Sequence, residues 1–396
     1  MPLCDPADGV VAPEKSSTPD LPEGVPRLGS FYIYLSDSCN MRCRHCWIEP
    51  QFTKGKPDPG HFVDIDALGQ AVREAKTLGL RAAKLTGGEP MLHPRFAEVV
   101  DLLTAEGLSM NMETNGTLLT AEAARQLKDK TNVTFVSVSL DGADARTHDT
   151  FRCVAGAFEA TLRGLLFLKD AGFKNSQVIM SVHRGNRGQV EAVAEVAAKH
   201  GAASLKLNPV TKTGRGTEMH EHGEALDFDE HMALARYVDY DLGPRAPLRI
   251  ILNIPPALSS LRSLRRTGGN CGDCHVRGIL GILGTNQYAL CGIGSTYPEF
   301  VYGRLDKDSI REIWLNNPTI LHLRQGLGDA DTFPGICAKC IFARTCRTGC
   351  VANNYAVGGQ LIIPNWMCAE AERRGLFPAD RAQRKPAAVE AGKSSG

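Results

Sequence analysis

Residues 39–46, with the sequence CNMRCRHC, place Cys39, Cys43 and Cys46 in a C-x3-C-x2-C pattern directly after a short β-type run at 31–35. In parallel α/β folds the loop after a strand lies at the carboxyl edge of the sheet, where these folds place their sites. Three thiolates close together can bind three irons of a [4Fe–4S] cluster, which leaves the fourth iron open to a cofactor or substrate. Zinc bound by the three cysteines and the neighbouring histidine is the alternative interpretation.

Outward from this triplet, β-like and helix-like segments alternate between about residues 30 and 225. The expected strands lie at 31–35, 82–85, 108–112, 133–140, 178–182 and 204–207. The helical segments with an apolar face include 65–75, 96–103, 121–127, 157–169 and 190–198. This alternation predicts a parallel sheet with helices outside it, because parallel strands need long crossover connections. Six such units could form an open sheet or a partial barrel, and the pattern alone does not choose between them.

A second and larger set of cysteines lies in a glycine-rich region with few periodic segments, after residue 257. Its members are Cys271, Cys274, Cys291, Cys337, Cys340, Cys346, Cys350 and Cys368. Eight cysteines are enough for two fully ligated four-cysteine clusters. A region that is rich in glycine and cysteine and has few periodic segments is usually stabilised by bound metal rather than by a large apolar core. Two structural zinc sites are the alternative, since C-x2-C pairs also occur in zinc ribbons. Cys4 and Cys153 are left outside both sets.

The composition narrows the class of protein. The 396 residues have a formal net charge of +1, so no broad basic field indicates nucleic acid or an anionic membrane as a partner. No run of about 18 apolar residues indicates a membrane span, and the first 25 residues lack the features of a secretory signal. We therefore expect a cytoplasmic protein, in which the 13 cysteines are better explained by cluster ligation than by disulfides.

Residues 39–46 resemble the cysteine signature of the radical S-adenosylmethionine (SAM) superfamily, and further segments resemble motifs of that family in the expected order. Gly87, Gly88 and Glu89, after the second expected strand, resemble the motif that meets the amino group of the methionine moiety of SAM. Asn115 follows the third expected strand. Each short motif is weak by itself, but together and in register they indicate the family strongly.

The segment with Ser139 and Asp141, and Arg152 downstream, resembles the fourth-strand part of that family that lines the nucleoside site. The resemblance covers about residues 30–230. It implies a partial (β/α)6 barrel, one [4Fe–4S] cluster, bound SAM, and formation of a 5′-deoxyadenosyl radical that takes hydrogen from a substrate.

The C-terminal cysteines resemble the SPASM domain, the auxiliary-cluster extension of many peptide-modifying radical enzymes. The family usually has glycine five residues before the position of Cys291, where this chain has Asn286. The resemblance implies two more [4Fe–4S] clusters with interleaved ligands. The first would be held by Cys271, Cys274, Cys291 and Cys350, and the second by Cys337, Cys340, Cys346 and Cys368.

We therefore expect an α/β barrel followed by a small cysteine-rich domain. The predicted layout is a flexible tail at 1–28, the barrel at 29–230, a connecting segment at 231–256, the SPASM domain at 257–372 and a tail at 373–396.

The resemblance favours a peptide or protein substrate, and most directly maturation of a ribosomally made peptide by a thioether, a carbon–carbon crosslink or ring formation. A reductant such as flavodoxin or ferredoxin and a separate leader-peptide-binding protein are the expected partners. One alternative is a sulfatase-activating formylglycine enzyme, which has an acidic base where this chain has Gly292. The others are a tetrapyrrole-tailoring radical enzyme and a non-catalytic iron–sulfur or zinc scaffold.

Overall fold

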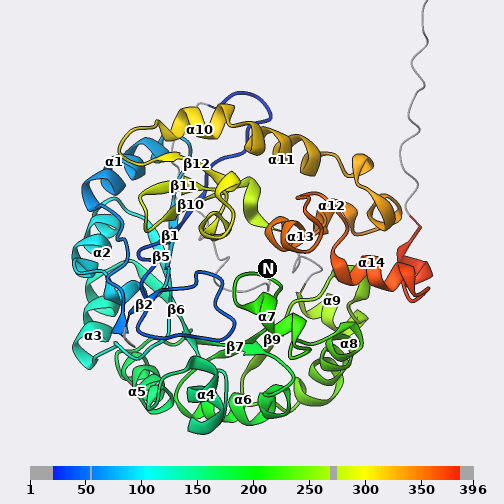
Figure 1. Ribbon diagram of the computed structural model, residues 1–396, viewed down its shortest axis with the longest axis horizontal. Helices are drawn as coiled ribbons and strands as arrows, with labels where there is room; N and C mark the ends of the chain where they lie inside the picture. The colour runs from blue at the N-terminus through cyan, green and yellow to red at the C-terminus, as the bar shows by residue number, and fades with distance from the viewer. Residues whose placement is uncertain (1–20, 54–55, 268–273, 384–396) are drawn as a thin grey trace, which may run out of the picture. The chain divides into compact units, whose positions relative to one another are not determined.

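The computed structural model describes residues 21–53, 56–267 and 274–383 (Figure 1). The described chain forms two compact units. The first, here called the barrel unit, contains residues 21–253 and 275–321. The second, the C-terminal unit, contains residues 254–267, 274 and 322–383. Cys4, Cys271, most of the predicted tail at 1–28 and the end of the tail at 373–396 lie outside the described residues.

The barrel unit is built on one sheet, which has ten strands in the described part of the chain, in the order β12-β11-β10-β1-β4-β5-β6-β7-β8-β9. The pairs from β10 through β1 to β9 are all parallel, and β11 and β12 are antiparallel additions. The strands are β1 Ser30–Tyr34, β4 Ala82–Thr86, β5 Ser109–Thr114, β6 Val133–Ser139, β7 Gln177–Val182, β8 Ser204–Pro209, β9 Arg249–Leu252, β10 Ile279–Leu283, β11 Gln287–Ala289 and β12 Val301–Arg304. A separate hairpin pairs β2 Phe52–Thr53 with β3 Lys56–Pro57.

Helices cover the outer side of this sheet, as Figure 1 shows for α1 to α6. Helices of the barrel unit are α1 Ile65–Lys76, α2 Phe96–Ala105, α3 Ala121–Lys130, α4 Ala145–Arg152, α5 Ala157–Asp170, α6 Val190–Lys199, α7 Gly216–Glu221, α8 Phe228–Arg236 and α10 Ile310–Asn316. A π-helical turn, Tyr237–Leu242, continues α8. The expected strands and helices are therefore present, and the α/β partial barrel is confirmed.

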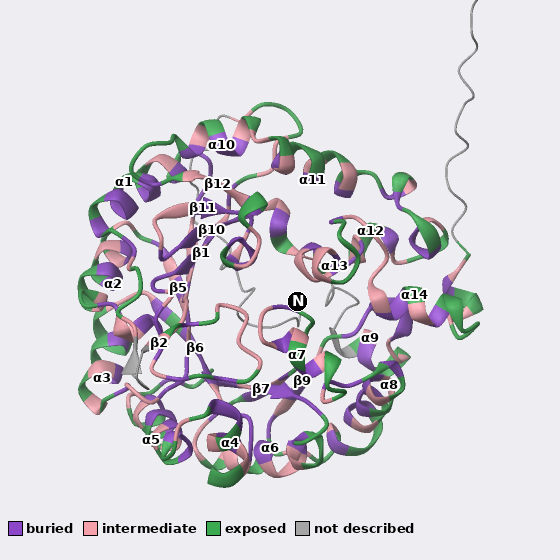
Figure 2. Cartoon of the chain, in the orientation of Figure 1, coloured by how far each residue is buried: buried purple, intermediate pink, exposed green. Residues whose placement is uncertain are grey.

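The core of the barrel unit lies between the sheet and its helices (Figure 2). Alternate strand residues, such as Ile33, Leu85 and Met112, are fully buried against helix residues such as Leu68 and Leu103. Apolar residues recur every second position in the strands and about every 3.6 positions in the helices, so each element has one apolar face. These faces meet and form one apolar layer between the sheet and the helices. It also leaves the other face of each strand directed away from the helices.

Several elements of the barrel unit were not expected from the sequence, among them β10 and α4. Strand β10 pairs in parallel with β1 and so extends the sheet beyond the predicted six strands. Its Leu280 and Ile282 are buried in the same core as the other strands, although the strand lies in a glycine-rich stretch. Helix α4 has a polar sequence, ARTHDTFR, with no broad apolar face, and begins at the side-chain cap that Asp144 gives to the Thr147 amide.

The C-terminal unit consists of short helices and turns. Its helices are α9 Leu261–Thr267, α12 Ala343–Cys346, α13 Val351–Gly358 and α14 Trp366–Arg373, and α11 Pro318–Gly328 runs across the division between the units. No strand of the described chain belongs to this unit. Elements this short bury little apolar surface, so a unit of this kind needs another source of stability.

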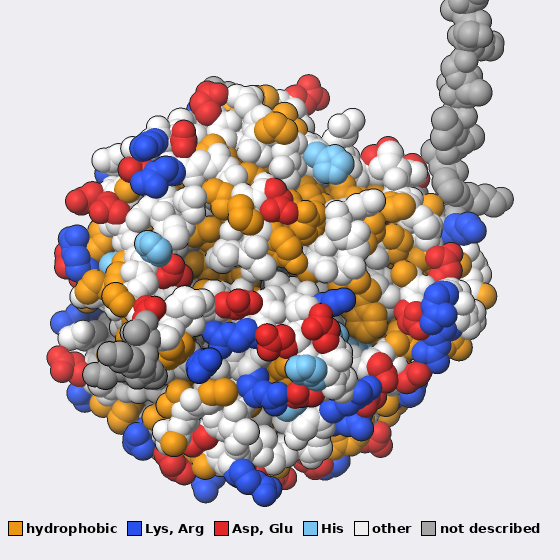
Figure 3. Space-filling view, in the orientation of Figure 1, with side chains coloured by type: hydrophobic (Ala, Val, Ile, Leu, Met, Phe, Trp, Pro, Cys, Tyr) orange, Lys and Arg blue, Asp and Glu red, His pale blue; other side chains and the backbone are white. Residues whose placement is uncertain are grey.

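On the face shown in Figure 3, lysine and arginine side chains alternate with aspartate and glutamate, without a large field of one sign. Among the described residues, none of the helices combines the length and the apolar character that crossing a membrane requires.

The contact between α5 and the loop after β5 gives a test of the fold. A Cβ at Gly164 would overlap the carbonyl oxygen of Gly116, which is rigid backbone. We expect Gly164→Ala to lower the free energy of unfolding by about 1–3 kcal/mol, because overpacking forces the backbone to shift. Gly69, also inside a helix, is the matched control, since its Cβ would meet only the flexible ends of Arg73 and Leu102 at 3.3 and 3.5 Å. Urea denaturation of both variants should show Gly69→Ala unchanged or stabilised by up to about 1 kcal/mol.

Candidate active site

The cysteine triplet lies in the loop that follows β1, at the carboxyl edge of the parallel strands. Cys39 and Cys43 are buried and Cys46 is partly exposed. Burial raises the pKa of the Cys39 thiol well above its usual range, and the nearby Glu89, Cys43 and Cys46 add to that effect. The structure therefore brings the three thiols together in a site with little water. The eleven cysteines that the structure describes are all free thiols.

Nitrogen donors point at the sulfur atoms of the two buried cysteines. The backbone N–H of Met41 donates to Cys39 Sγ at 3.4 Å, and Asn115 Nδ2 lies 3.9 Å from the same sulfur. Arg152 Nη1 donates to Cys43 Sγ at 3.3 Å. Burial raises the pKa of Cys43, and the positive charge of Arg152 opposes this rise. N–H groups directed at sulfur favour the thiolate, which is the form that binds iron, and they tune the potential of a cluster.

Arg152 also forms a buried ion pair with Asp141, with 2.5 Å between Arg152 Nε and Asp141 Oδ2. Asp141 is fully buried, and its other oxygen accepts the Ser181 backbone N–H at 2.7 Å. Although burial would raise it, the pKa of Asp141 is held below its usual range by the charge of Arg152. The backbone carbonyl of Arg152 in turn accepts the N–H of Arg42 at 3.2 Å. The end of β6, the end of α4 and the cysteine loop are thus joined through one guanidinium.

The predicted glycine pair lies against the backbone that leads into the cysteine loop. The N–H of Gly88 donates to Ser36 O at 2.7 Å and that of Glu89 to Ser38 O at 2.9 Å. A Cβ at Gly88 would overlap the Ser38 carbonyl, and Gly87 has φ +135°. Both glycines are therefore required for this close approach of two loops, whatever else they contact.

Glu89 is fully buried at the same edge of the sheet. Its carboxylate accepts hydrogen bonds from Thr114 Oγ1 and the Asn115 N–H, both at 2.8 Å, and from the Met91 N–H at 3.2 Å. Burial raises the pKa of Glu89 to about 6, against these hydrogen bonds. Asn115 Nδ2 donates to Asn40 Oδ1 at 2.7 Å, which ties the loop after β5 to the cysteine loop. Ser139, the last residue of β6, is partly exposed at that edge.

An aromatic stack that the sequence analysis did not predict lies beside these residues. His45 stacks on Phe151, with ring centroids 4.7 Å apart, and Phe151 stacks on His183 at 4.4 Å. Burial lowers the pKa of His45 to about 4, and its Nε2 lies 3.0 Å from Ser181 Oγ. A neutral imidazole in this position presents an uncharged, flat ring face next to Cys46. The only hint in the sequence was one phenylalanine in the polar segment that forms α4.

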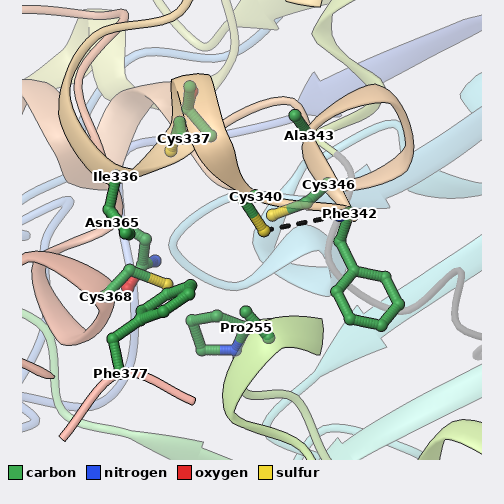
Figure 4. A pocket seen from close by; sticks show the side chains of 12 residues that line it. Pro255, Ile336, Cys337, Cys340, Phe342, Ala343, Cys346, Asn365, Cys368 and Phe377 are labelled. Atoms are coloured by element: carbon green, nitrogen blue, oxygen red, sulfur yellow. Dashed lines mark hydrogen bonds between the residues drawn. The ribbon is translucent and has the colours of Figure 1, made fainter. Parts of the chain in front are cut away.

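Four cysteines of the second set surround one cavity in the C-terminal unit (Figure 4). They are Cys337, Cys340, Cys346 and Cys368. Most other lining side chains are apolar, such as Pro255 and Phe377, and Thr348 and Asn365 are polar. Burial, together with the nearby Cys346 and Cys340, raises the pKa of Cys337 to about 12. Burial also raises the pKa of Cys368. In the apo protein Cys337 and Cys368 are therefore protonated, and a metal must displace these protons when it binds.

Cys350 lies elsewhere in the same unit, against Cys274. A hydrogen bond from the Cys274 thiol is the main cause that lowers the pKa of Cys350 to about 6. Cys350 therefore lies beside Cys274, which is more than 70 positions upstream in the sequence. The resemblance to the SPASM domain assigns these two cysteines to the same cluster. Cys291 belongs to the barrel unit, where its charge raises the pKa of buried Tyr34 and Tyr302 in addition to the effect of burial.

The donor set fits iron–sulfur clusters. Within the described residues, no three His, Cys, Asp or Glu side chains converge closely enough to hold a single metal ion. A [4Fe–4S] cluster makes a different demand, because each thiolate binds its own iron. The triplet after β1 and the four cysteines around the cavity both consist of thiols alone, which are the ligands such clusters use.

His148 gives a pH test of this buried network. It is fully buried, its Nδ1 accepts the Asp141 N–H at 3.1 Å, and burial lowers its pKa to about 4. The unfolded chain takes up the proton near pH 6.5, so the stability from neutral His148 is present above that pH and lost as the pH falls. We expect wild type to lose about 2 kcal/mol more than His148→Gln between pH 7 and pH 5.

Urea titrations of the apo protein at the two pH values measure this difference. Replacement of the exposed His222 by Gln is the control and should follow wild type. Equal pH dependence of wild type and His148→Gln would show that His148 is not held neutral.

Comparison with known proteins identifies the family. Residues 33–197 match the Radical SAM superfamily. The chain is 28% identical over 368 residues to AdoMet-dependent heme synthase of Nitratidesulfovibrio vulgaris, covering 89% of this chain and 95% of that protein. It is 27% identical over 361 residues to mycofactocin maturase MftC of Mycobacterium tuberculosis, covering 89% and 86%.

Solved structures show the same fold. Streptococcus suis SuiB bound to S-adenosylmethionine has a TM-score of 0.64 at 15% identity, covering 87% of this chain and 77% of that one. The enzyme anSMEcpe with bound AdoMet has a TM-score of 0.64 at 17% identity, covering 87% and 95%. Together with the cysteine loop, these matches show that residues 33–197 form a radical SAM domain and that the protein is a radical SAM enzyme, with SPASM-type relatives over most of its length.

Proposed function

We propose that this enzyme modifies a peptide or protein substrate, and most directly that it matures a ribosomally made peptide. The observation that carries the proposal is the second cysteine set, in which four thiols, three of them buried, surround one cavity in the C-terminal unit. Peptide-modifying relatives match the chain broadly: the maturase MftC over 89% of its length, and the subtilosin biosynthesis protein AlbA of Bacillus subtilis over 80%. Solved structures of the same fold contain bound peptides.

In this proposal Cys39, Cys43 and Cys46 hold the cluster that binds SAM. When bound, cluster and SAM supply a 5′-deoxyadenosyl radical, which takes one hydrogen atom from the substrate. The chain's residues orient and shield these groups. Arg152 donates a hydrogen bond to the sulfur of Cys43, and the carboxylate of Asp141 neutralises its charge. The buried carboxylate of Glu89 is suited to bind the amino group of SAM.

The remaining cysteines complete the proposal. Cys337, Cys340, Cys346 and Cys368 hold one auxiliary cluster, and Cys274 and Cys350 belong to another with Cys291 and Cys271. Fully ligated clusters suit electron transfer, and a crosslink or ring formed after hydrogen abstraction needs an acceptor for one further electron. A flavodoxin or ferredoxin as reductant and a separate leader-peptide-binding protein remain part of this proposal.

A second candidate is modification of a tetrapyrrole. The observation that favours it is the similarity to AdoMet-dependent heme synthases from two bacteria and from Methanosarcina barkeri, at 27–29% identity. The match covers 95% of one of these proteins, so it includes the C-terminal region as well as the barrel.

Iron content and SAM cleavage test the cluster assignments. After anaerobic reconstitution we expect about twelve irons per wild-type chain, four for each cluster. Cys43→Ala should lose about four irons and all formation of 5′-deoxyadenosine, and Cys340→Ala should lose about four irons from the auxiliary site. Cys153→Ala, at an exposed thiol outside both sets, is the matched control and should keep both. Retention of deoxyadenosine formation by Cys43→Ala would contradict the role of the triplet.

Product analysis separates the two candidate substrates. The reconstituted enzyme with SAM and reductant is incubated with short peptides encoded beside its gene, or with an iron porphyrin that has propionate groups. Maturation predicts a mass decrease of about two hydrogens in one peptide for each crosslink formed, and no change in the porphyrin. A changed porphyrin with unchanged peptides would replace the first proposal by the second.

A further inference from the structure

The turn between β8 and α7 meets the cysteine loop, although the two segments follow strands that lie far apart in the sheet. Strands β4, β5, β6 and β7 separate β1 from β8 in the sheet order. Cys43 and Cys46 follow β1, and Arg215 follows β8. The backbone N–H of Arg215 nevertheless donates to Cys46 O at 3.1 Å. The contact therefore joins the loops of two strands that do not pair with each other.

The side chain of Arg215 contacts the cysteine loop at two further carbonyl groups. Its Nη1 donates to Cys43 O at 3.0 Å, and its Nη2 donates to Pro50 O at 3.1 Å. These carbonyls lie at opposite ends of the segment 43–50, so one planar guanidinium holds both ends. Hydrogen bonds from a charged donor are stronger than those between neutral groups. With its backbone contact to Cys46, Arg215 makes three hydrogen bonds to this segment.

Gly214, the residue before Arg215, allows the turn to come this close to the cysteine loop. It has φ +54°, and a Cβ at this position would lie 2.5 Å from Trp47 Cα and 2.8 Å from Cys46 O. Both are backbone atoms, which cannot move aside as the end of a flexible side chain can. Glycine is therefore required here twice, by the left-handed backbone and by the contact with the cysteine loop.

Two arginines from different parts of the barrel unit hold Cys43 at different atoms. Arg152 donates to Cys43 Sγ at 3.3 Å, whereas Arg215 donates to the carbonyl oxygen of the same residue. One arginine therefore acts on the direction of the thiol, and the other acts on the position of the backbone that carries it. Groups that orient a metal ligand without binding the metal typically change metal affinity by about 10–100-fold when they are removed.

We propose that Arg215 is a positioning residue, which holds the segment 43–50 in the conformation that brings Cys43 and Cys46 into place for cluster binding. This inference rests on the proposed function only in assigning a cluster to the cysteine triplet. The planar fork of the guanidinium is essential to the role, because its two terminal nitrogens reach two separate carbonyls. The single ammonium group of a lysine keeps the charge but not this geometry.

Backbone hydrogen exchange of the full-length apo protein tests the contact itself. The amides of Arg44 and Cys46 donate to backbone carbonyls at 3.0 and 3.3 Å, so their exchange reports on the conformation of the cysteine loop. We expect Arg215→Gln to speed exchange in a peptide covering 42–50 by about tenfold, and Arg215→Lys to restore slow exchange only in part. Arg125→Gln, at an exposed arginine on α3, removes the same charge and should exchange like wild type.

A second variant tests the same contact from the neighbouring position. Gly214→Ala pushes the turn away from the cysteine loop and should speed exchange of the same peptide. Gly107→Ala is the matched control, since Gly107 also has a left-handed backbone, at φ +75°, but a Cβ there would meet no atom within 4 Å. If Arg215→Gln or Gly214→Ala exchanges like wild type in this peptide, or if Arg215→Lys restores wild-type exchange completely, the proposal is wrong.

Cluster retention in the anaerobically reconstituted enzyme measures the consequence for the site. The change that SAM causes in the electron paramagnetic resonance spectrum of the reduced enzyme reports the cluster of the triplet. An iron chelator should abolish this change about tenfold faster in Arg215→Gln than in wild type or Arg125→Gln. Equal rates would overturn the role of Arg215 in cluster binding. A wild-type enzyme without iron or without a response to SAM would instead remove the proposed function, and the exchange data would still decide whether Arg215 orders the loop.

Discussion

The candidate active site depends on the contacts of one buried group, the guanidinium of Arg152. It lies between the Asp141 carboxylate, at 2.5 Å, and the Cys43 sulfur, at 3.3 Å. A cation this deeply buried is stable only with its partners in place, because removing one partner leaves an uncompensated charge that costs about 3–5 kcal/mol. Asp141 follows β6, Arg152 ends α4 and Cys43 lies after β1, so the charge balance also fixes three separate segments relative to one another.

Close backbone contacts supply the geometry that this charge balance requires. Gly88 and Glu89 donate to the Ser36 and Ser38 carbonyls, and a side chain at Gly88 would displace the loop that begins at Cys39. Glu89 then bonds to the strand-end residues Thr114 and Asn115. The carboxyl ends of β1, β4 and β5 are therefore connected by hydrogen bonds that do not depend on a cofactor. The site is largely preformed, which reduces the ordering that binding must supply.

Much of this arrangement could be predicted from the sequence. The apolar runs at 82–85 and 178–182 are strands because β-branched and apolar residues there are buried under helices, and loop residues after parallel strands necessarily meet at one edge. Other features depend on contacts that no local pattern contains. Strand β10 exists because Leu280 and Ile282 find a core made by distant residues, and the stacking of His45 on Phe151 joins residues 106 positions apart. The chemical roles of the assigned residues were not accessible from pattern alone and remain proposals.

The two cysteine groups lie in units that differ in how they are stabilised. In the barrel unit, a large apolar core holds the sheet, so the cysteine loop contributes little to folding and can be optimised for chemistry. The C-terminal unit has only short helices in its described part, and its buried thiols line the cavity that a larger apolar core would otherwise fill. Protonated thiols supply weak packing and few hydrogen bonds, whereas a bound cluster links four distant points of the chain. Under the proposed function, folding of the C-terminal unit would be coupled to cluster assembly, whereas the barrel sheet has its own apolar layer.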